Sequence, residues 1–261
     1  MKLSFSNIAW DFDQNDEICD MLKGYHFSGI EIAPTIISAD PFTKNITTIK
    51  NFSDSLFEKY NFVIPSMQSI WFGKTENIFN PNDVDTMINY TKKIIDLADI
   101  INCPNLVFGC PKNRNMPAPN LENQVIPFFK TIGDYAHQNN TCIALEANPV
   151  IYNTNFINTT SEAFSFAKKV ASDGLKVNVD LGTIIYNNES LELLSKNPEL
   201  INHIHISEPN LVPIEKRSLH QELSHLLKEV GYQKFISVEM KNPGKTDIIE
   251  DTAKYISEIF V

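Results

Sequence analysis

Hydrophobic and polar residues follow two patterns along the chain, short apolar runs and longer amphipathic segments. The amphipathic segments, such as residues 84–103 and 121–140, carry apolar residues at helical spacing with charged residues between them. Short, nearly continuous apolar runs are typical of strands that are buried on both faces, as in a parallel sheet covered by helices. Eight runs are of this kind: 2–10, 29–33, 62–70, 105–109, 142–146, 175–180, 201–206 and 235–240.

Eight strand–helix units in 261 residues predict an α/β fold, a single (β/α)8 TIM barrel over residues 1–261. No linker or change of composition divides the chain. A doubly wound nucleotide-binding sheet would need a glycine-rich turn after an early strand, and the first run leads instead into WDFDQND. The barrel predicts an active site in the loops at the carboxyl ends of the strands.

Charge and composition narrow the class of function. The formal net charge of −10 argues against a surface that binds nucleic acid or an anionic membrane, because phosphates are bound by cationic patches. The sequence contains no run of about 18 apolar residues, so no membrane span is predicted. The first residues lack the apolar stretch of a signal peptide, so we expect a cytoplasmic protein. The four cysteines form no C-x-x-C pair, which favours buried, reduced thiols.

Ionisable residues stand at or near the ends of the last four runs. They are Glu146, Asp180, His205 and Glu239. Because the carboxyl ends of barrel strands converge, these side chains are expected to meet at the mouth, where three carboxylates would repel one another unless a cation lay among them. His203 lies on the same strand face as His205 and is expected one layer deeper, as a neutral histidine.

This predicted cluster indicates one divalent metal ion. Three carboxylates and an imidazole suit Mn²⁺, Mg²⁺ or Co²⁺ better than Zn²⁺, whose structural sites prefer cysteine and histidine. Four protein ligands leave room for a hydroxyl and a carbonyl oxygen of a sugar. A carboxylate on each side of such a substrate would act as base and acid in turn.

Other side chains near predicted strand ends are candidates for substrate contacts. Arg114 follows the fourth run, and Lys216 and Arg217 follow the seventh; such cations favour an anionic sugar or sugar acid, with surface solvation as the alternative. Trp10 and Trp71 follow the first and third runs and offer aromatic faces for a sugar, with core packing as the alternative. Glu31, inside the second run, is a candidate to bind substrate or to orient a neighbouring side chain.

The segments GIEIAP, LVFGCPKNR, IALEANP, VNVDLGT, HIHISE and GYQKFISVEM, in this order, resemble the xylose-isomerase-like barrels. The resemblance is to the sugar phosphate isomerase/epimerase branch, and it covers nearly the whole chain. It implies that Glu146, Asp180, His205 and Glu239 are metal ligands. It further implies that Glu146 and Glu239 transfer the proton through an enediolate.

Two positions depart from the ketose epimerases of that branch. Those enzymes carry a histidine where this chain has Thr183, and an arginine where it has Leu211. Both family residues hold substrate oxygens, so a pocket of different chemistry is expected around the same metal centre.

The sequence therefore predicts a metal-dependent isomerase or epimerase of a small ketose, sugar phosphate or sugar acid. A dehydratase or lyase acting on a cyclic polyol or keto sugar is the alternative at the same centre, and a non-catalytic binding protein is a further one. A phosphodiester hydrolase related to endonuclease IV would need many histidines for a multinuclear zinc site, and the chain has only six. Its acidic net charge also opposes binding to DNA. The oligomeric state stays open, although barrels of this family commonly form homodimers.

Overall fold

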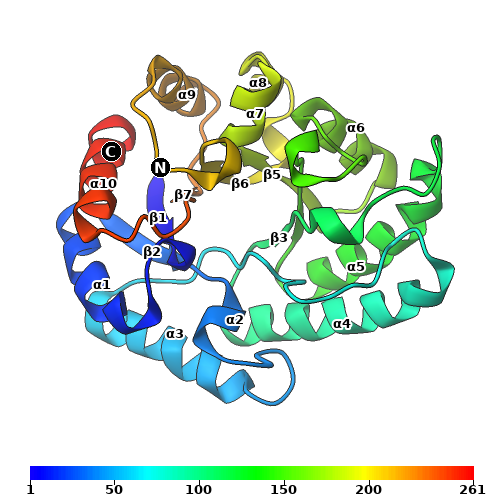
Figure 1. The fold of residues 1–261 in the computed structure, drawn as a ribbon, viewed down its shortest axis with the longest axis horizontal. Coiled ribbons are helices and arrows are strands. Elements are labelled where there is room, and N and C mark those ends of the chain that lie inside the picture. Colours follow the sequence, from blue (N-terminus) through cyan, green and yellow to red (C-terminus); the bar gives the residue numbers. More distant parts are fainter.

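The computed structural model describes residues 1–261, and helices surround a curled parallel sheet (Figure 1). The sheet has seven strands in the order β2-β1-β7-β6-β5-β4-β3, and all neighbouring pairs are parallel. The strands are β1 (Lys2–Ser6), β2 (Phe27–Glu31), β3 (Leu106–Phe108), β4 (Ile143–Glu146), β5 (Leu175–Asp180), β6 (Ile201–Ile206) and β7 (Phe235–Val238). Six of the eight predicted strands thus lie within two residues of their expected bounds.

The expectation of eight strands is not confirmed, because residues 62–70 do not form a regular strand. This segment makes isolated parallel bridges at Val63 and Met67, which join it to β2 on one side and to β3 on the other. It therefore lies between the two edge strands, in the position expected of the missing strand. Pro65 lacks an N–H group and cannot donate to a ladder, which explains why the pairing is interrupted.

The first predicted strand is also shorter than expected. β1 ends at Ser6, and Asn7–Ala9 forms the 3₁₀ turn η1. The buried Asn7 side chain accepts a hydrogen bond from the backbone N–H of Ala33 at 2.7 Å. A side chain in the loop after β1 is thereby tied to the backbone after β2, while Ala9 and Trp10 of the apolar run are buried in the core.

The helices cover the outer face of the sheet. The two amphipathic segments of the sequence correspond to α4, which begins at Pro81 after the capping side chain of Asn80, and to α5, which follows a 3₁₀ turn. The helices are α1 (Asn15–Gly24), α2 (Pro34–Ile37), α3 (Ile46–Tyr60), α4 (Pro81–Ile100), α5 (Ile126–Gln138), α6 (Thr160–Val170), α7 (Leu181–Asn187), α8 (Glu192–Ser195), α9 (Ser218–Glu229) and α10 (Thr246–Phe260).

The buried apolar side chains form one cluster of 65 residues, which runs from β1 to α10. All four cysteines are unpaired, and three of them are buried, as the sequence predicts; Cys110 is half-buried. No helix combines the length and the apolar character that a membrane crossing requires. Several polar side chains, among them Ser4, Ser6 and Ser237, are buried on the sheet beside the apolar core.

Candidate metal centre

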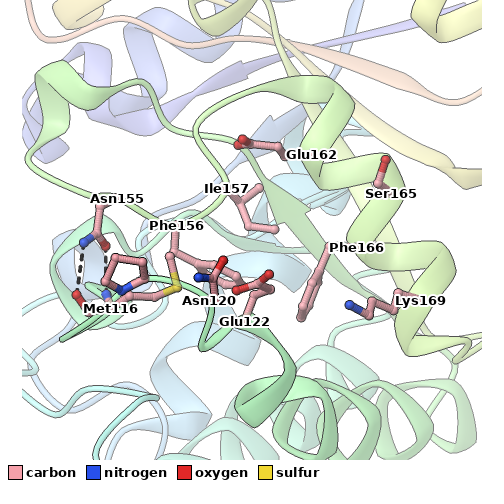
Figure 2. A pocket seen from close by; sticks show the side chains of 11 residues that line it. Met116, Asn120, Glu122, Asn155, Phe156, Ile157, Glu162, Ser165, Phe166 and Lys169 are labelled. Carbon is pink, nitrogen blue, oxygen red and sulfur yellow. Dashed lines mark hydrogen bonds between the residues drawn. The ribbon is translucent and has the colours of Figure 1, made fainter.

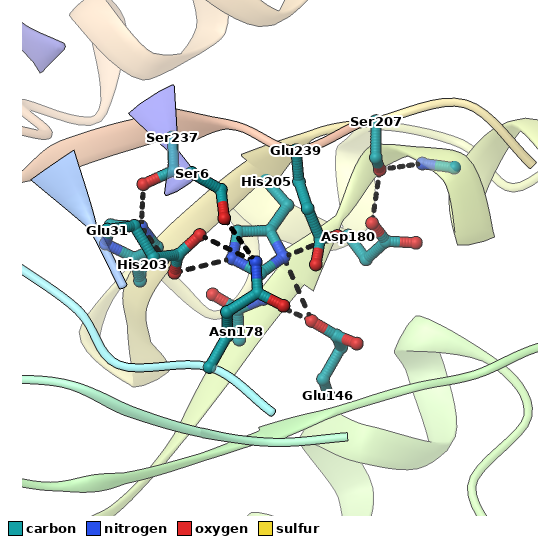
Figure 3. A network of polar contacts seen from close by, with 12 residues as sticks. Ser6, Glu31, Glu146, Asn178, Asp180, His203, His205, Ser207, Ser237 and Glu239 are labelled. Atoms are coloured by element: carbon teal, nitrogen blue, oxygen red, sulfur yellow. Dashed lines mark hydrogen bonds and ion pairs between the residues drawn. The ribbon is translucent and has the colours of Figure 1, made fainter. Parts of the chain in front are cut away.

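The four residues predicted as metal ligands come together at one end of the sheet (Figure 3). Glu146 and Asp180 are the last residues of β4 and β5, His205 lies near the end of β6, and Glu239 directly follows β7. Nδ1 of His205 is 3.1 Å from Oε2 of Glu146 and 3.1 Å from Oε2 of Glu239. Asp180 pairs with His205 in the strand register and offers a further carboxylate oxygen to this group. All four side chains are buried.

The orientation of the His205 ring is set by Glu31. Oε1 of Glu31 is 2.9 Å from Nε2 of His205, and both side chains are fully buried. A carboxylate can only accept a hydrogen bond here, so Nε2 carries a proton. When the ring is singly protonated, as a metal ligand must be, the Nδ1 lone pair faces Glu146 and Glu239. Glu31 was a candidate for orienting a neighbour, and His205 is the neighbour that it contacts. Gln68 donates to Oε2 of Glu31 at 3.4 Å.

Asp180 is held by the start of α7. Its Oδ2 accepts hydrogen bonds from the backbone N–H of Thr183 and from the Thr183 hydroxyl, both at 2.7 Å, and Oδ1 accepts from Ser207. Asp180 is thus the N-cap of α7, and Thr183, which stands where the ketose epimerases carry a histidine, donates two of the hydrogen bonds that fix it. Burial, together with the charges of Glu146 and Glu239, raises the pKa of Asp180 to about 7.

The two carboxylates predicted to transfer the proton have different surroundings. Glu146 accepts a hydrogen bond from Asn148 at 2.9 Å on Oε1 and from Asn178 at 2.6 Å on Oε2. Glu239 makes its polar side-chain contact with His205. Glu146 is therefore fixed by two amide donors, whereas Glu239 contacts the His205 ring.

His203 occupies the deeper position that alternation along the strand predicts. Its Nε2 lies 2.7 Å from the hydroxyl of Ser237 and 3.7 Å from Oε1 of Glu31. Burial lowers the pKa of His203 well below its usual value, and the neighbouring His205 lowers it further, so the ring is neutral. His203 thus takes part in the polar network beneath the four candidate ligands.

The predicted loop cations are engaged with the protein itself. Arg114 is fully buried and donates to Asn148 at 2.7 Å, which contradicts the surface-solvation alternative for this residue. Arg217 binds both carboxylate oxygens of the buried Glu208 at 2.7 Å and also contacts Glu215. Lys216 is exposed, and its Nζ lies 5.4 Å from the centre of the Tyr255 ring.

Both tryptophans pack in the core, each 3% exposed. Trp10 meets Phe5 edge to face, in agreement with the core-packing alternative. Trp71 packs edge to face against Phe108 and Phe128, and its indole N–H donates to Thr91 at 3.2 Å. Direct stacking of either ring on a sugar stays a prediction.

Several residues of the site were not singled out from the sequence: Asn148, Asn178, Ser207 and Gln68. The alternation of side chains along a strand could have indicated Asn178, because it lies two residues before Asp180 and therefore on the same strand face. Asn148 is likewise two residues beyond Glu146, but it lies past the end of β4, where alternation no longer predicts direction.

A separate cavity of about 460 Å³ lies between the loop after β3 and helix α6 (Figure 2). Its walls include the buried Phe156 and Phe166 and the exposed side chains of Glu162 and Lys169. None of the four candidate ligands lines it, so this cavity is distinct from the metal centre.

A model of the xylose isomerase-like TIM barrel family matches residues 19–259. The chain belongs to this family. The family resemblance drawn from the sequence is therefore confirmed, and the seven strands with their bridged segment are this chain's version of the family barrel. No curated protein matches the chain by sequence.

Solved structures with the same fold share little sequence with this chain. A 3-keto-D-glucoside 4-epimerase, YcjR, from E. coli is 15% identical, with a TM-score of 0.79 over 99% of each chain. A D-psicose 3-epimerase from Clostridium cellulolyticum H10, solved with D-tagatose, is 13% identical, with a TM-score of 0.81 over 100% of this chain and 99% of the other. The IOLI protein, solved with a binding zinc atom, is 15% identical, with a TM-score of 0.71 over 100% and 99%.

The cluster in this family member fits a divalent cation. His205 Nδ1 is buried without a hydrogen-bond partner, although two carboxylate oxygens lie 3.1 Å away. Ligand atoms at about 2.0–2.2 Å from an octahedral ion are about 3 Å from their neighbours, which is the spacing observed. In the metal-free protein, burial opposes a charge on His205, but Glu31, Glu239 and Glu146 outweigh it and raise the pKa of His205 well above its usual value. The site therefore requires a positive charge, which a proton or a metal ion supplies.

Proposed function

We propose that this protein is a divalent-metal-dependent isomerase or epimerase of a small ketose, sugar phosphate or sugar acid. The observation that carries the proposal is the placement of Glu146 and Glu239 on either side of His205, each 3.1 Å from Nδ1. Two carboxylates that approach one point from different strands are suited to remove a proton from one face of a bound substrate and return one to the other face.

Glu146, Asp180, His205 and Glu239 would hold the ion, with Mn²⁺, Mg²⁺ or Co²⁺ preferred to Zn²⁺ by the oxygen-rich set. A bound divalent ion supplies Lewis acidity, which polarises a substrate carbonyl and acidifies the adjacent C–H bond. Glu31 contributes by keeping the His205 ring fixed and its Nδ1 lone pair directed at the ligand cluster.

In this mechanism one carboxylate takes the proton from the carbon next to the carbonyl, which leaves an enediolate. The other carboxylate then donates a proton to a carbon of that enediolate. Asn148 and Asn178 hold Glu146 in place by hydrogen bonds to both of its oxygens, so we assign Glu146 as the base in one direction of the reaction. Glu239 is then the acid, and the roles exchange in the reverse reaction.

The substrate class follows from the relatives and from the loop cations. Two structures of the same fold have titles that name epimerases of sugars, a 3-keto-D-glucoside and D-psicose, which supports a carbohydrate. Arg114 and Arg217 are engaged with Asn148 and with Glu208. Because Arg217 already pairs with a carboxylate and Arg114 is fully buried, we place a neutral ketose first among the three substrate classes. A cytoplasmic location and a homodimer complete the proposal.

The proposal is tested by incubating the Mn²⁺-loaded protein with a panel of ketoses, sugar phosphates and keto acids in D₂O. An isomerase or epimerase places solvent deuterium on carbon without net loss of water. Loss of water to an enone or deoxy product would establish the dehydratase alternative instead. Glu146→Gln and Glu239→Gln are each expected to abolish turnover, and full activity in Glu239→Gln would exclude the two-carboxylate mechanism.

A further inference from the structure

Arg114 is a buried cation without a carboxylate partner. Its side chain is fully buried, it forms no salt bridge, and Nε and Nη1 have no hydrogen-bond partner. Burying a charge without a counter-charge costs free energy, and such exceptions to ordinary packing concentrate at functional sites. Burial lowers the pKa of Arg114 to about 10, so the guanidinium still carries its charge at neutral pH.

A short chain of hydrogen bonds connects this cation to the metal centre. Nη2 of Arg114 donates to Oδ1 of Asn148 at 2.7 Å, and Nδ2 of Asn148 donates to Oε1 of Glu146 at 2.9 Å. A guanidinium can only donate and a carboxylate can only accept, so the Asn148 amide satisfies both partners in one orientation and neither in the flipped one. Arg114 therefore fixes the direction in which Asn148 presents its amide to Glu146.

The two loops that meet at the Arg114–Asn148 contact are each anchored by further hydrogen bonds. The backbone of Asn148 donates to Ile157 at 3.1 Å, and its carbonyl accepts from the side chain of Asn158 at 2.8 Å. On the other side, Asn113, next to Arg114, is buried and donates to the carbonyls of Lys74 and Glu76. The two loops are thus held in place, and the Arg114–Asn148 contact is a fixed connection between them.

The space around Glu146 also leaves little room for a different position. A Cβ atom added at Gly109 would lie 2.9 Å from Oε1 of Glu146 and 3.4 Å from Oδ1 of Asn148. The glycine backbone therefore closes one side of the carboxylate, and the Asn148 amide holds it from another.

We propose that Arg114 is a positioning residue for Glu146, acting through Asn148, and does not itself bind an anionic group of the substrate. This inference rests on the proposed function, because it assumes that Glu146 is a metal ligand and a proton-transfer group. It predicts that removing Arg114 or Asn148 affects metal binding and the chemical step together, and that the two residues act as one unit.

The test compares Arg114→Met, Asn148→Ala and the double variant in Mn²⁺ titrations of the metal-free protein, and in kinetics with the ketose that wild type turns over. Groups that orient metal ligands typically contribute 10–100-fold in affinity, so each single variant is expected to weaken Mn²⁺ binding by about that factor. We expect kcat to fall with KM nearly unchanged, and the double variant to match the weaker single variant. Lys112→Ala, which removes an exposed cation two residues away, is the matched control and should bind Mn²⁺ as wild type does.

Three outcomes would overturn the inference. The first is a raised KM with unchanged Mn²⁺ affinity in Arg114→Met. The second is a double variant whose loss of Mn²⁺ affinity is the product of the two single losses. The third is wild-type Mn²⁺ affinity in both single variants. If Arg114→Met does not fold, Arg114→Lys replaces it in the test. This variant keeps the charge but has a single ammonium group in place of the guanidinium, and it is also expected to weaken Mn²⁺ binding. Wild-type protein that binds no Mn²⁺ would contradict the proposed function itself, so the two failures are distinguishable.

Discussion

Glu31 and His205 form a hydrogen bond of 2.9 Å between side chains that are 174 positions apart in the chain and both fully buried. This contact determines which nitrogen of His205 faces the other three candidate ligands. The candidate metal centre therefore depends on β2 as well as on the four strands that supply the ligands.

Replacing Glu31 by glutamine is expected to weaken Mn²⁺ binding by about 10–100-fold, because the ring of His205 loses the negative charge that holds and polarises it. Isothermal titration of the metal-free protein measures the change. Glu58→Gln, an exposed residue of α3, is the control with the same change of charge. Equal affinity in Glu31→Gln and wild type would show that Glu31 has no part in the site.

Gly109→Ala is expected to displace Glu146 while leaving the fold intact. The added Cβ would lie 2.9 Å from Oε1 of Glu146, the end of a side chain that can move aside. We expect weaker Mn²⁺ binding and at least a tenfold loss of turnover, with little change in the melting temperature. Gly24→Ala is the control, because a Cβ there meets no atom within 4 Å. Unchanged Mn²⁺ affinity in Gly109→Ala would contradict the close approach of backbone and carboxylate.

The metal-free protein is expected to lose stability as pH rises from about 6.5 to 7.5. The pKa of Asp180 is raised to about 7 in the folded state from an ordinary value of 3.8, and the pKa of His205 is raised well above 6.5. The folded protein therefore binds more protons than the unfolded chain in this window, so the free energy of unfolding falls with increasing pH. Burial lowers the pKa values of His203 and His220, which act in the opposite direction mainly below pH 6.5, while Asp16 and Asp134 have lowered pKa values and titrate far below this window.

Melting temperatures of metal-free and Mn²⁺-loaded protein across this pH range measure the effect. Because Mn²⁺ replaces the protons, its stabilising effect should grow as pH rises. The Asp180→Asn variant should show a shallower pH dependence in the metal-free form. A melting temperature of metal-free wild type that climbs steadily from pH 6.5 to 7.5 is the opposite of the expected result.

Strand ends were the most predictable part of this protein. Glu146, Asp180 and His205 lie on strands whose apolar runs are continuous, and the convergence of parallel strands then places their side chains together whatever the details of the loops. Glu239 lies one residue beyond β7, but its backbone N–H still donates to the carbonyl of Ile206, which extends the strand pairing to it.

Contacts that depend on tertiary packing were not predictable in the same way. The burial of Arg114 results from the loop that carries it packing against the loop after β4, and no local pattern indicates that. The segment 62–70 is as apolar as a buried strand, yet Pro65 removes one donor from the ladder, and its bridges to β2 and β3 do not extend into regular pairing. Hydrophobic pattern thus predicted the place of this segment but not its conformation.

The central claim is that Glu146, Asp180, His205 and Glu239 together hold one divalent cation. Titration of the metal-free protein with Mn²⁺, followed by electron paramagnetic resonance of the free ion, tests it most directly. We predict one tightly bound ion per chain in wild type, and a loss of that binding in His205→Ala, whose side chain is central to the cluster. Wild type that binds no Mn²⁺, or His205→Ala that binds as tightly as wild type, would contradict it.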